Sequence, residues 1–218
     1  MSPIYDTSAE AELLAGMRLA RTAIGRGDLV VIPTDTVYGV AADAFNPAAV
    51  LKLVEAKGRT RAVPPPVLVP GIPTLDALAA EVPQAVRDLV AEFWPGALTI
   101  ILPAQPSLDW DLGDTQGTVA VRMPDHRIAL ELLSETGPLA VSSANRHGEA
   151  AATTAEQADA ALGDSVAVVL DAGPSGDTPS TIVDATGLAA GTGKLRIVRD
   201  GVISRDEIVR VVGAEQCA

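Results

Sequence analysis

The chain has 218 residues, of which 48% are hydrophobic and only 3% aromatic, so its core must consist mainly of aliphatic side chains. The 16 Lys and Arg residues against 28 Asp and Glu residues give a formal net charge of −12, which excludes extensive wrapping by a nucleic-acid backbone. A single cysteine, Cys217, and two histidines exclude an internal disulfide framework and a structural zinc site of ordinary composition.

The N-terminal half of the chain predicts alternating helices and strands. Thr7 and Glu10 have the spacing of a capping box, and apolar residues then recur at helical intervals up to Ile24. Asn46 followed by Pro47 is typical of a helix N-terminus. The expected elements are, in order, a helix over 7–24, strands over 29–32 and 37–42, a helix over 46–57, a strand over 67–69, and helices over 75–80 and 84–92.

The C-terminal half continues in the same way. Asp125 is expected to cap a helix, and the pairs Thr154 with Gln157 and Ser204 with Glu207 have capping-box spacing. Strands are expected over 98–102, 118–122, 139–141, 166–170, 181–184 and 195–198. Several of these strands follow one another without an intervening helix. The pattern therefore predicts a single α/β domain with a twisted, mixed parallel and antiparallel sheet and flanking helices.

The segment from Pro33 to Gly39, with the sequence PTDTVYG, directly follows a buried strand. Loops at strand ends are where α/β proteins place ligands. Its two hydroxyls and one carboxylate could bind a ligand, or they could satisfy the backbone groups of a tight turn. The residues alone leave both interpretations open.

A cluster of cations follows the predicted helix 46–57. In an extended segment, Lys57, Arg59 and Arg61 would point to the same side and form a site for an anion. Cations at the end of a helix also complement its dipole, which is the alternative explanation. Phosphate binding and dipole compensation are both consistent with this segment.

Two further features come from predicted strand ends. Ser142 to Asn145, with the sequence SSAN, offers small and polar residues that would let a ligand approach the backbone, or it is an ordinary polar loop. Arg122 could hold a carboxylate or pair with one of the many acidic residues.

The segment from Gly191 to Lys194 lacks the first glycine and the final Ser or Thr of a phosphate loop, so it predicts a hairpin turn.

Together these segments resemble the YrdC-like family of threonylcarbamoyl-AMP synthases. The KxR and SxN signatures of that family correspond to 57–59 and 143–145. Further matches follow in the same order, and the resemblance covers about residues 10–212. They are the PTDTVYG loop, the WPG turn at 94–96, VRMP at 121–124, STIVD at 180–184 and Arg199. The resemblance implies a twisted mixed α/β sheet around a concave, basic cavity.

The resemblance also implies a reaction: L-threonine, bicarbonate and ATP condense into threonylcarbamoyl-AMP and pyrophosphate, with Mg²⁺ accompanying the triphosphate. It implies a threonine side made of Thr36, Arg122 and Ser142. On the ATP side, with Lys57 and Arg59 as the catalytic cations, it implies Lys57, Arg59, Thr118, Ser143, Ala144, Asn145 and Arg199. No metal site made of protein side chains is expected. The implied partner is the transferase that modifies tRNA, with only weak or indirect contact to tRNA itself.

The chain departs from the family pattern at several positions. Many relatives have Pro, Asn and His where this chain has Thr60, Val63 and Leu68, and a Ser where it has His147. These differences leave room for a relative that binds nucleotide but uses another substrate, and an RNA-binding module is a further alternative. We expect the domain to span 1–218 without an additional C-terminal domain, a signal peptide or a membrane span, and the protein to be cytoplasmic.

Overall fold

In the computed structural model, residues 1–218 fold around one ten-stranded sheet with the strand order β1-β8-β2-β3-β7-β4-β6-β5-β9-β10. The strands are β1 (Ile4–Asp6), β2 (Leu29–Ile32), β3 (Gly39–Asp43), β4 (Val67–Leu68), β5 (Leu98–Pro103), β6 (Thr118–Arg122), β7 (Leu139–Ser143), β8 (Val166–Asp171), β9 (Thr181–Asp184) and β10 (Arg196–Arg199). The helices are α1 (Glu10–Gly25), α2 (Pro47–Ala56), α3 (Ile72–Leu78), α4 (Gln84–Phe93), α5 (Arg127–Thr136), α6 (Ala155–Leu162), α7 (Thr186–Ala189) and α8 (Arg205–Val212), and a 3₁₀ turn covers Gly163–Ser165.

The sheet is mixed, which confirms the predicted class. Strand β8 pairs in parallel with β1 and β2, β4 pairs in parallel with β6, and β5 pairs in parallel with β9. The remaining pairs, including β2 with β3 and β5 with β6, are antiparallel. The short connections between antiparallel neighbours explain why the sequence shows strands without helices between them.

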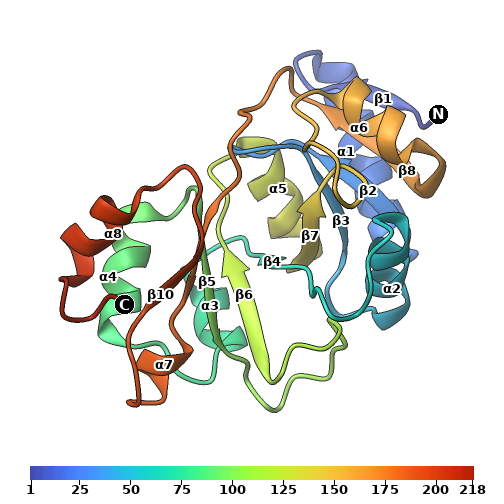
Figure 1. Cartoon of the computed structure of the whole chain (residues 1–218). Helices are drawn as coiled ribbons and strands as arrows, with labels where there is room; N and C mark the ends of the chain where they lie inside the picture. Colours follow the sequence, from blue (N-terminus) through green and yellow to red (C-terminus); the bar gives the residue numbers. More distant parts are fainter.

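One half of the sheet is covered by helices on both faces. Val30 and Ile32 of β2 pack in one core cluster with residues of α1 and α5, whereas Leu29 and Val31 pack in another with residues of α2 and α6. Because side chains alternate along a strand, a continuous apolar run is what this two-sided burial requires. Figure 1 shows α1, α2 and α6 gathered around this half.

The other half is covered by α3, α4 and α8, which lie together in Figure 1. Leu98, Ile100 and Leu102 of β5 belong to the core cluster that contains residues of these helices, and so do Val119 and Val121 of β6. Their neighbours in sequence point to the opposite face of the sheet because strand side chains alternate. That face carries the cavity described below.

The structure corrects two predicted helix caps. Helix α1 begins at Glu10 after Ala9, and the hydroxyl of Thr7 instead donates to the carbonyl of Asp171 at 2.8 Å. Strand β1, which the sequence pattern missed, places Thr7 beside β8. Asp125 does not cap α5, whose N-cap is His126. The backbone N–H of Asp125 instead donates to the carboxylate of Asp35 at 3.0 Å.

Other caps match the prediction. Asn46 accepts from the N–H of Ala49 at the start of α2, and Ser204 with Glu207 forms a complete capping box on α8. Thr154 caps α6, but the side chain of Gln157 accepts from Thr153 rather than closing the box. The short helix α7 was not predicted.

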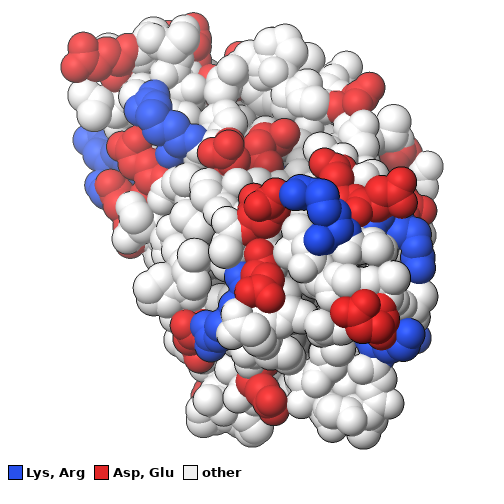
Figure 2. Space-filling view, turned by 90° about the vertical axis from the view of Figure 1, so that its left-hand side faces the viewer, with Lys and Arg blue, Asp and Glu red and all other residues white.

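Acidic and basic side chains are interspersed on the face shown in Figure 2. Many exposed cations are neutralised locally, as in the ion pairs of Arg61 with Asp111 at 2.7 Å and of Arg87 with Asp76 at 2.9 Å. No helix combines the length and the hydropathy that crossing a membrane would require.

Candidate functional site

A cavity of about 480 Å³ opens on the sheet face that lies opposite α3, α4 and α8. Thr99 of β5, Arg122 of β6 and Ile182 of β9 line it because they alternate with the core-facing residues of their strands. The loop after β2 and the end of β7 form the other walls, because β4 pairs with both β7 and β6 and so joins the two halves of the sheet. The strand ends thereby bring distant motifs to one place.

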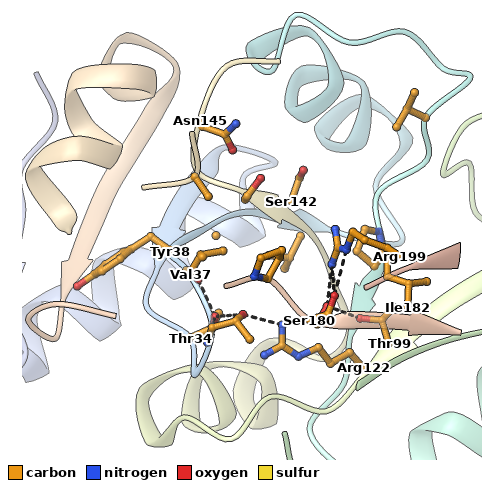
Figure 3. Close-up of a pocket in the computed structure, with 18 of the residues that line it drawn as sticks. Thr34, Val37, Tyr38, Thr99, Arg122, Ser142, Asn145, Ser180, Ile182 and Arg199 are labelled. Atoms are coloured by element: carbon orange, nitrogen blue, oxygen red, sulfur yellow. Dashed lines mark hydrogen bonds between the residues drawn. The ribbon is translucent and has the colours of Figure 1, made fainter. Parts of the chain in front are cut away.

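Seven of the ten predicted site residues line this cavity: Thr36, Arg59, Arg122, Ser142, Ser143, Asn145 and Arg199. Figure 3 shows Ser142 and Asn145 on one side of it and Arg122 on the other, with Arg199 reaching in from β10. Residues as far apart in the sequence as Thr36 and Arg199 therefore converge on a single space, which neither a tight turn nor a polar loop requires.

The other three predicted residues do not line the cavity. Ala144 is fully buried, and its N–H donates to the carbonyl of Tyr38 at 2.7 Å. Thr118 lies on the same face of β6 as Arg122. It faces an adjoining cavity of about 250 Å³, which shares Pro64 with the larger one. Lys57 has no exposed surface.

The ammonium group of Lys57 is held by the SxN segment. Its Nζ donates to the carbonyl oxygens of Ser143 and Asn145 at 2.5 Å each and to Oδ1 of Asn145 at 2.9 Å. These three acceptors match the three hydrogens of an ammonium group. Burial, together with the nearby charge of Arg59, lowers the pKa of Lys57 to about 7, while Glu149 opposes this shift. Lys57 therefore fixes the backbone that carries Ser143 and Asn145.

Of the expected cluster of three cations, only Arg59 lines the cavity, because Lys57 is fully buried and Arg61 lies elsewhere. Arg61 does not line the cavity and forms a bidentate pair with Asp111, at 3.0 and 2.7 Å, with Asp114 at 3.7 Å from its Nε. Turns at 57–58 and at 61–62 interrupt this segment, so the alternation of an extended strand does not apply. Arg61 belongs to a local ion pair on the surface.

Arg59 and Arg199 are cations without a carboxylate partner. Arg59 donates to the hydroxyl of Ser142 at 3.2 Å, and its buried Nε has no hydrogen-bond partner. Arg199 donates to the carbonyl and hydroxyl of Ser180, at 2.7 and 2.9 Å from Nη2. Burial lowers the pKa of both guanidinium groups, and the charges of Arg122 and Arg59 lower that of Arg199 further. This uncompensated positive charge calls for an anion in the cavity.

Arg122 is the most constrained cation of the site. Its side chain is 7% exposed and donates to Asp35 at 2.6 Å, to the hydroxyl of Thr36 at 2.9 Å and to the carbonyl of Gly96 at 2.9 Å. Burial lowers its pKa, and the carboxylate of Asp35 opposes the shift. Three of its five N–H donors are used, so two remain for a ligand.

Sequence reasoning missed several residues that line the cavity. Thr34, Thr99, Ser180 and Glu149 belong to it, and Glu149 is its single acidic side chain. Thr34 and Ser180 lie inside motifs that were recognised, whereas nothing in the sequence marks Thr99 or Glu149. The departures from the family pattern, Val63, Leu68 and His147, also line the cavity.

The chemistry of this site is that of anion recognition. No group of three or more His, Cys, Asp or Glu side chains could hold a metal ion by itself. Three arginines, several hydroxyls and one amide surround a space large enough for a small organic ligand. Fold and site thus define a mixed α/β protein with a basic cavity for a phosphate- or carboxylate-bearing ligand.

Comparisons with known proteins agree with this class. The model of the Sua5/YciO/YrdC family, described as telomere recombination, matches residues 22–201. A Mycobacterium tuberculosis protein is 48% identical over 216 residues, which are 99% of this chain and 97% of that protein. The threonylcarbamoyl-AMP synthase of Bacillus subtilis is 38% identical over 196 residues, covering 89% of this chain and 56% of that protein. This chain belongs to the Sua5/YciO/YrdC family.

A solved structure supports the same assignment. The crystal structure of Pyrococcus abyssi Sua5 complexed with L-threonine superposes with a TM-score of 0.88 at 31% identity, covering all of this chain. The chain spans 62% of that Sua5 chain. The resemblance to the YrdC-like family expected from the motifs is therefore confirmed.

Proposed function

We propose that this chain is a threonylcarbamoyl-AMP synthase that acts as a nucleotidyltransferase. It condenses L-threonine, bicarbonate and ATP and releases pyrophosphate. Relatives across most of the chain carry the synthase name, and a similar structure is described as a complex with L-threonine. The observation that carries the proposal is the set of arginines, Arg59, Arg122 and Arg199, around one cavity without enough carboxylates to neutralise them.

The proposed chemistry needs no protein nucleophile. The amine of threonine and bicarbonate form a carbamate with loss of water, and a carbamate oxygen attacks the α-phosphorus of ATP. The bond between the α-phosphorus and the bridging oxygen breaks, and pyrophosphate leaves with that oxygen. Orientation, charge neutralisation and exclusion of water from the labile carbamate are the protein's contributions.

The residues divide the cavity between the two substrates. Arg122 binds the carboxylate of threonine with its two free N–H groups, next to Thr36 and Ser142. Arg59, Ser143, Asn145 and Arg199 contact the nucleotide. Lys57 contributes its charge and holds the SxN segment, the N–H of Ala144 keeps that segment against Tyr38, and Thr118 contacts the part of ATP that reaches the adjoining cavity.

The cavity fits a Mg²⁺ ion carried by the triphosphate. Mg²⁺ in such sites is bound by substrate phosphates together with one or two carboxylates. Glu149 is the one carboxylate of the lining and would be its protein ligand. The ion would neutralise charge that develops on the leaving pyrophosphate.

The product is a reactive acyl-adenylate, so we propose transient contact with the downstream tRNA threonylcarbamoyl transferase. Contact with tRNA itself is weak or indirect. The proposal includes a cytoplasmic location, because its substrates and tRNA are present there.

The decisive experiment measures pyrophosphate release from ATP with Mg²⁺ and bicarbonate, in the presence and absence of L-threonine. The wild type should release pyrophosphate only with threonine. Arg59→Ala should lower the rate by about 10²- to 10³-fold, by analogy with the loss of an oxyanion donor. Arg61→Ala is the matched control, because Arg61 lies two residues away but pairs with Asp111 outside the cavity.

Release that does not depend on threonine, in folded protein that binds ATP, would contradict the synthase and favour a nucleotide-binding relative with another substrate. Equal losses in Arg59→Ala and Arg61→Ala would contradict the placement of the triphosphate beside Arg59.

A further inference from the structure

The hydroxyl of Thr34 has no hydrogen available for a ligand. Thr34 and Thr36 are 5% and 2% exposed, and both line the cavity. The Oγ of Thr34 lies 2.6 Å from the carbonyl oxygen of Val37, which can only accept. The single hydrogen of the Thr34 hydroxyl is therefore committed to Val37, as the dashed line between these two residues in Figure 3 shows.

This assignment fixes the direction of the next hydrogen bond. The Oγ atoms of Thr34 and Thr36 are 3.1 Å apart, and geometry alone would allow either to be the donor. Because the hydrogen of Thr34 is already used, Thr36 donates to Thr34. The backbone N–H of Thr36 also donates to Thr34 at 3.2 Å, so both lone pairs of the Thr34 oxygen are filled.

Thr36 is left with one free site, and that site is an acceptor. The hydrogen of its hydroxyl points to Thr34. One lone pair of its Oγ accepts a hydrogen bond from Nη1 of Arg122, with the two atoms 2.9 Å apart. A hydroxyl has one hydrogen and two lone pairs, so a single lone pair remains for the cavity. Thr36 can therefore receive a hydrogen bond from a ligand but cannot give one.

We propose that Thr34 is a positioning residue: it holds the Thr36 hydroxyl as an acceptor for the N–H of the substrate's α-nitrogen. The proposal rests on the proposed function, in which Arg122 binds the carboxylate. A group on the carbon next to that carboxylate lies beside Thr36, because Arg122 holds Thr36 directly. The nitrogen keeps one N–H after it becomes a carbamate, so the same contact survives the first step of the reaction.

The test uses the kinetics of threonine-dependent pyrophosphate release. Thr34→Val keeps the shape but removes the hydroxyl, so the hydrogen of Thr36 is free to turn into the cavity. We expect the KM for L-threonine to rise about tenfold, with the KM for ATP unchanged. Thr34→Ser restores the hydroxyl and should return the KM for threonine to within about threefold of the wild type.

A double-mutant cycle separates positioning from a general structural role. If Thr34 acts through Thr36, Thr34→Val should change the KM for threonine little when Thr36→Val is already present. Additive effects, equal rises in the two KM values, or a wild-type KM in Thr34→Val would overturn the proposal. Absence of threonine-dependent release in the wild type would instead contradict the proposed function.

A measurement on the wild type covers the case in which Thr34→Val fails to fold. 2-Hydroxybutyrate and 2-oxobutyrate have the same charge and nearly the same shape, but only the hydroxyl compound can donate a hydrogen bond at the α position. We expect 2-oxobutyrate to inhibit about tenfold more weakly. Equal inhibition by the two compounds would overturn the assignment of Thr36 as an acceptor.

Discussion

At the scale of single residues, the site depends on cations whose partners differ. Lys57 donates all its hydrogens to the SxN segment, Arg122 is paired with Asp35, and Arg59 has a buried Nε without a partner. Cationic residue types that look equivalent in sequence thus have distinct tasks. Their partners decide which of them is available to a ligand.

The low pKa of Lys57 predicts pH-dependent binding of ATP. With its pKa at about 7, Lys57 loses its proton above that pH in the free protein, and a bound polyanion raises the pKa again. Binding therefore takes up a proton, and the affinity should fall as the pH rises above 7, by at most about tenfold per pH unit.

Calorimetric titration with ATP and Mg²⁺ at several pH values, in buffers of different ionisation enthalpy, measures the proton uptake. The Lys57→Met variant should lack this part of the pH dependence. Unchanged proton uptake in Lys57→Met would show that another group is responsible.

We expect Asp35 to contribute to the stability of the fold, because its carboxylate compensates the buried charge of Arg122. Its side chain is 15% exposed and accepts from both Arg122 and the N–H of Asp125. Asp35→Ala should lower the free energy of unfolding by about 3 kcal/mol, since the Arg122 charge then lacks its partner.

Urea denaturation measures this loss. Asp35→Asn keeps an oxygen acceptor for both donors and serves as the matched variant, with a smaller loss expected. A fully stable Asp35→Ala protein would contradict the structural role of the ion pair.

At the scale of elements, the loop after β2 is held in place by the end of β8 and the segment that follows it. The hydroxyl of Tyr38 donates to the carbonyl of Gly173 at 2.7 Å and lies 3.1 Å from a carboxylate oxygen of Asp171, and burial raises the pKa of Tyr38 to about 12. Gly176 also lies against the loop, and a Cβ at this position would come within 2.8 Å of the carbonyl oxygen of Thr36. The segment after β8 therefore sets the position of Thr36.

Gly176→Ala tests this packing. The added methyl group must displace the backbone of Thr36, so we expect the KM for L-threonine to rise by about tenfold or more, while the nucleotide side is less affected. Gly25→Ala at the end of α1 is the control, since a Cβ there has no neighbour within 4 Å. The control should keep wild-type kinetics and gain up to about 1 kcal/mol of stability. Equal kinetics for both variants would show that Thr36 does not depend on Gly176.

At the scale of the whole molecule, charge separates the inside of the cavity from the outer surface. The chain carries a net charge of −12, whereas three arginines and one glutamate line the cavity. On the face in Figure 2, acidic and basic side chains alternate rather than form a broad basic surface. Such a molecule can attract a nucleotide into its cavity while it repels a long phosphate backbone.

We therefore expect purified protein to form no stable complex with tRNA in a filter-binding assay at about 0.15 M salt. An established tRNA-binding protein in the same assay is the positive control. Tight binding with a steep dependence on salt would contradict the expectation and revive an RNA-binding function.

The class of the fold and seven of the 24 residues that line the cavity could be predicted from the sequence. Apolar runs such as 29–32 predicted buried strands, and the resemblance to the YrdC-like family implied Thr36, Arg59, Arg122, Ser142, Ser143, Asn145 and Arg199, which the fold brings together. These features depend on local pattern and on chemistry that a short segment displays. They can therefore be recognised in the sequence without knowledge of the tertiary structure.

The partners of these residues follow from how the elements pack and could not be predicted from the sequence. Strand β1 and the true role of Thr7 depend on pairing with β8, more than 160 residues away. Whether Arg61 faces the cavity, and whether Lys57 is free or held, depends on a turn and on carbonyl groups contributed by another strand. Hydrogen-bond direction at Thr34 likewise follows from the exact set of neighbours. Long-range contacts of this kind leave no periodic signal in the sequence, because each one is set by how separate elements pack.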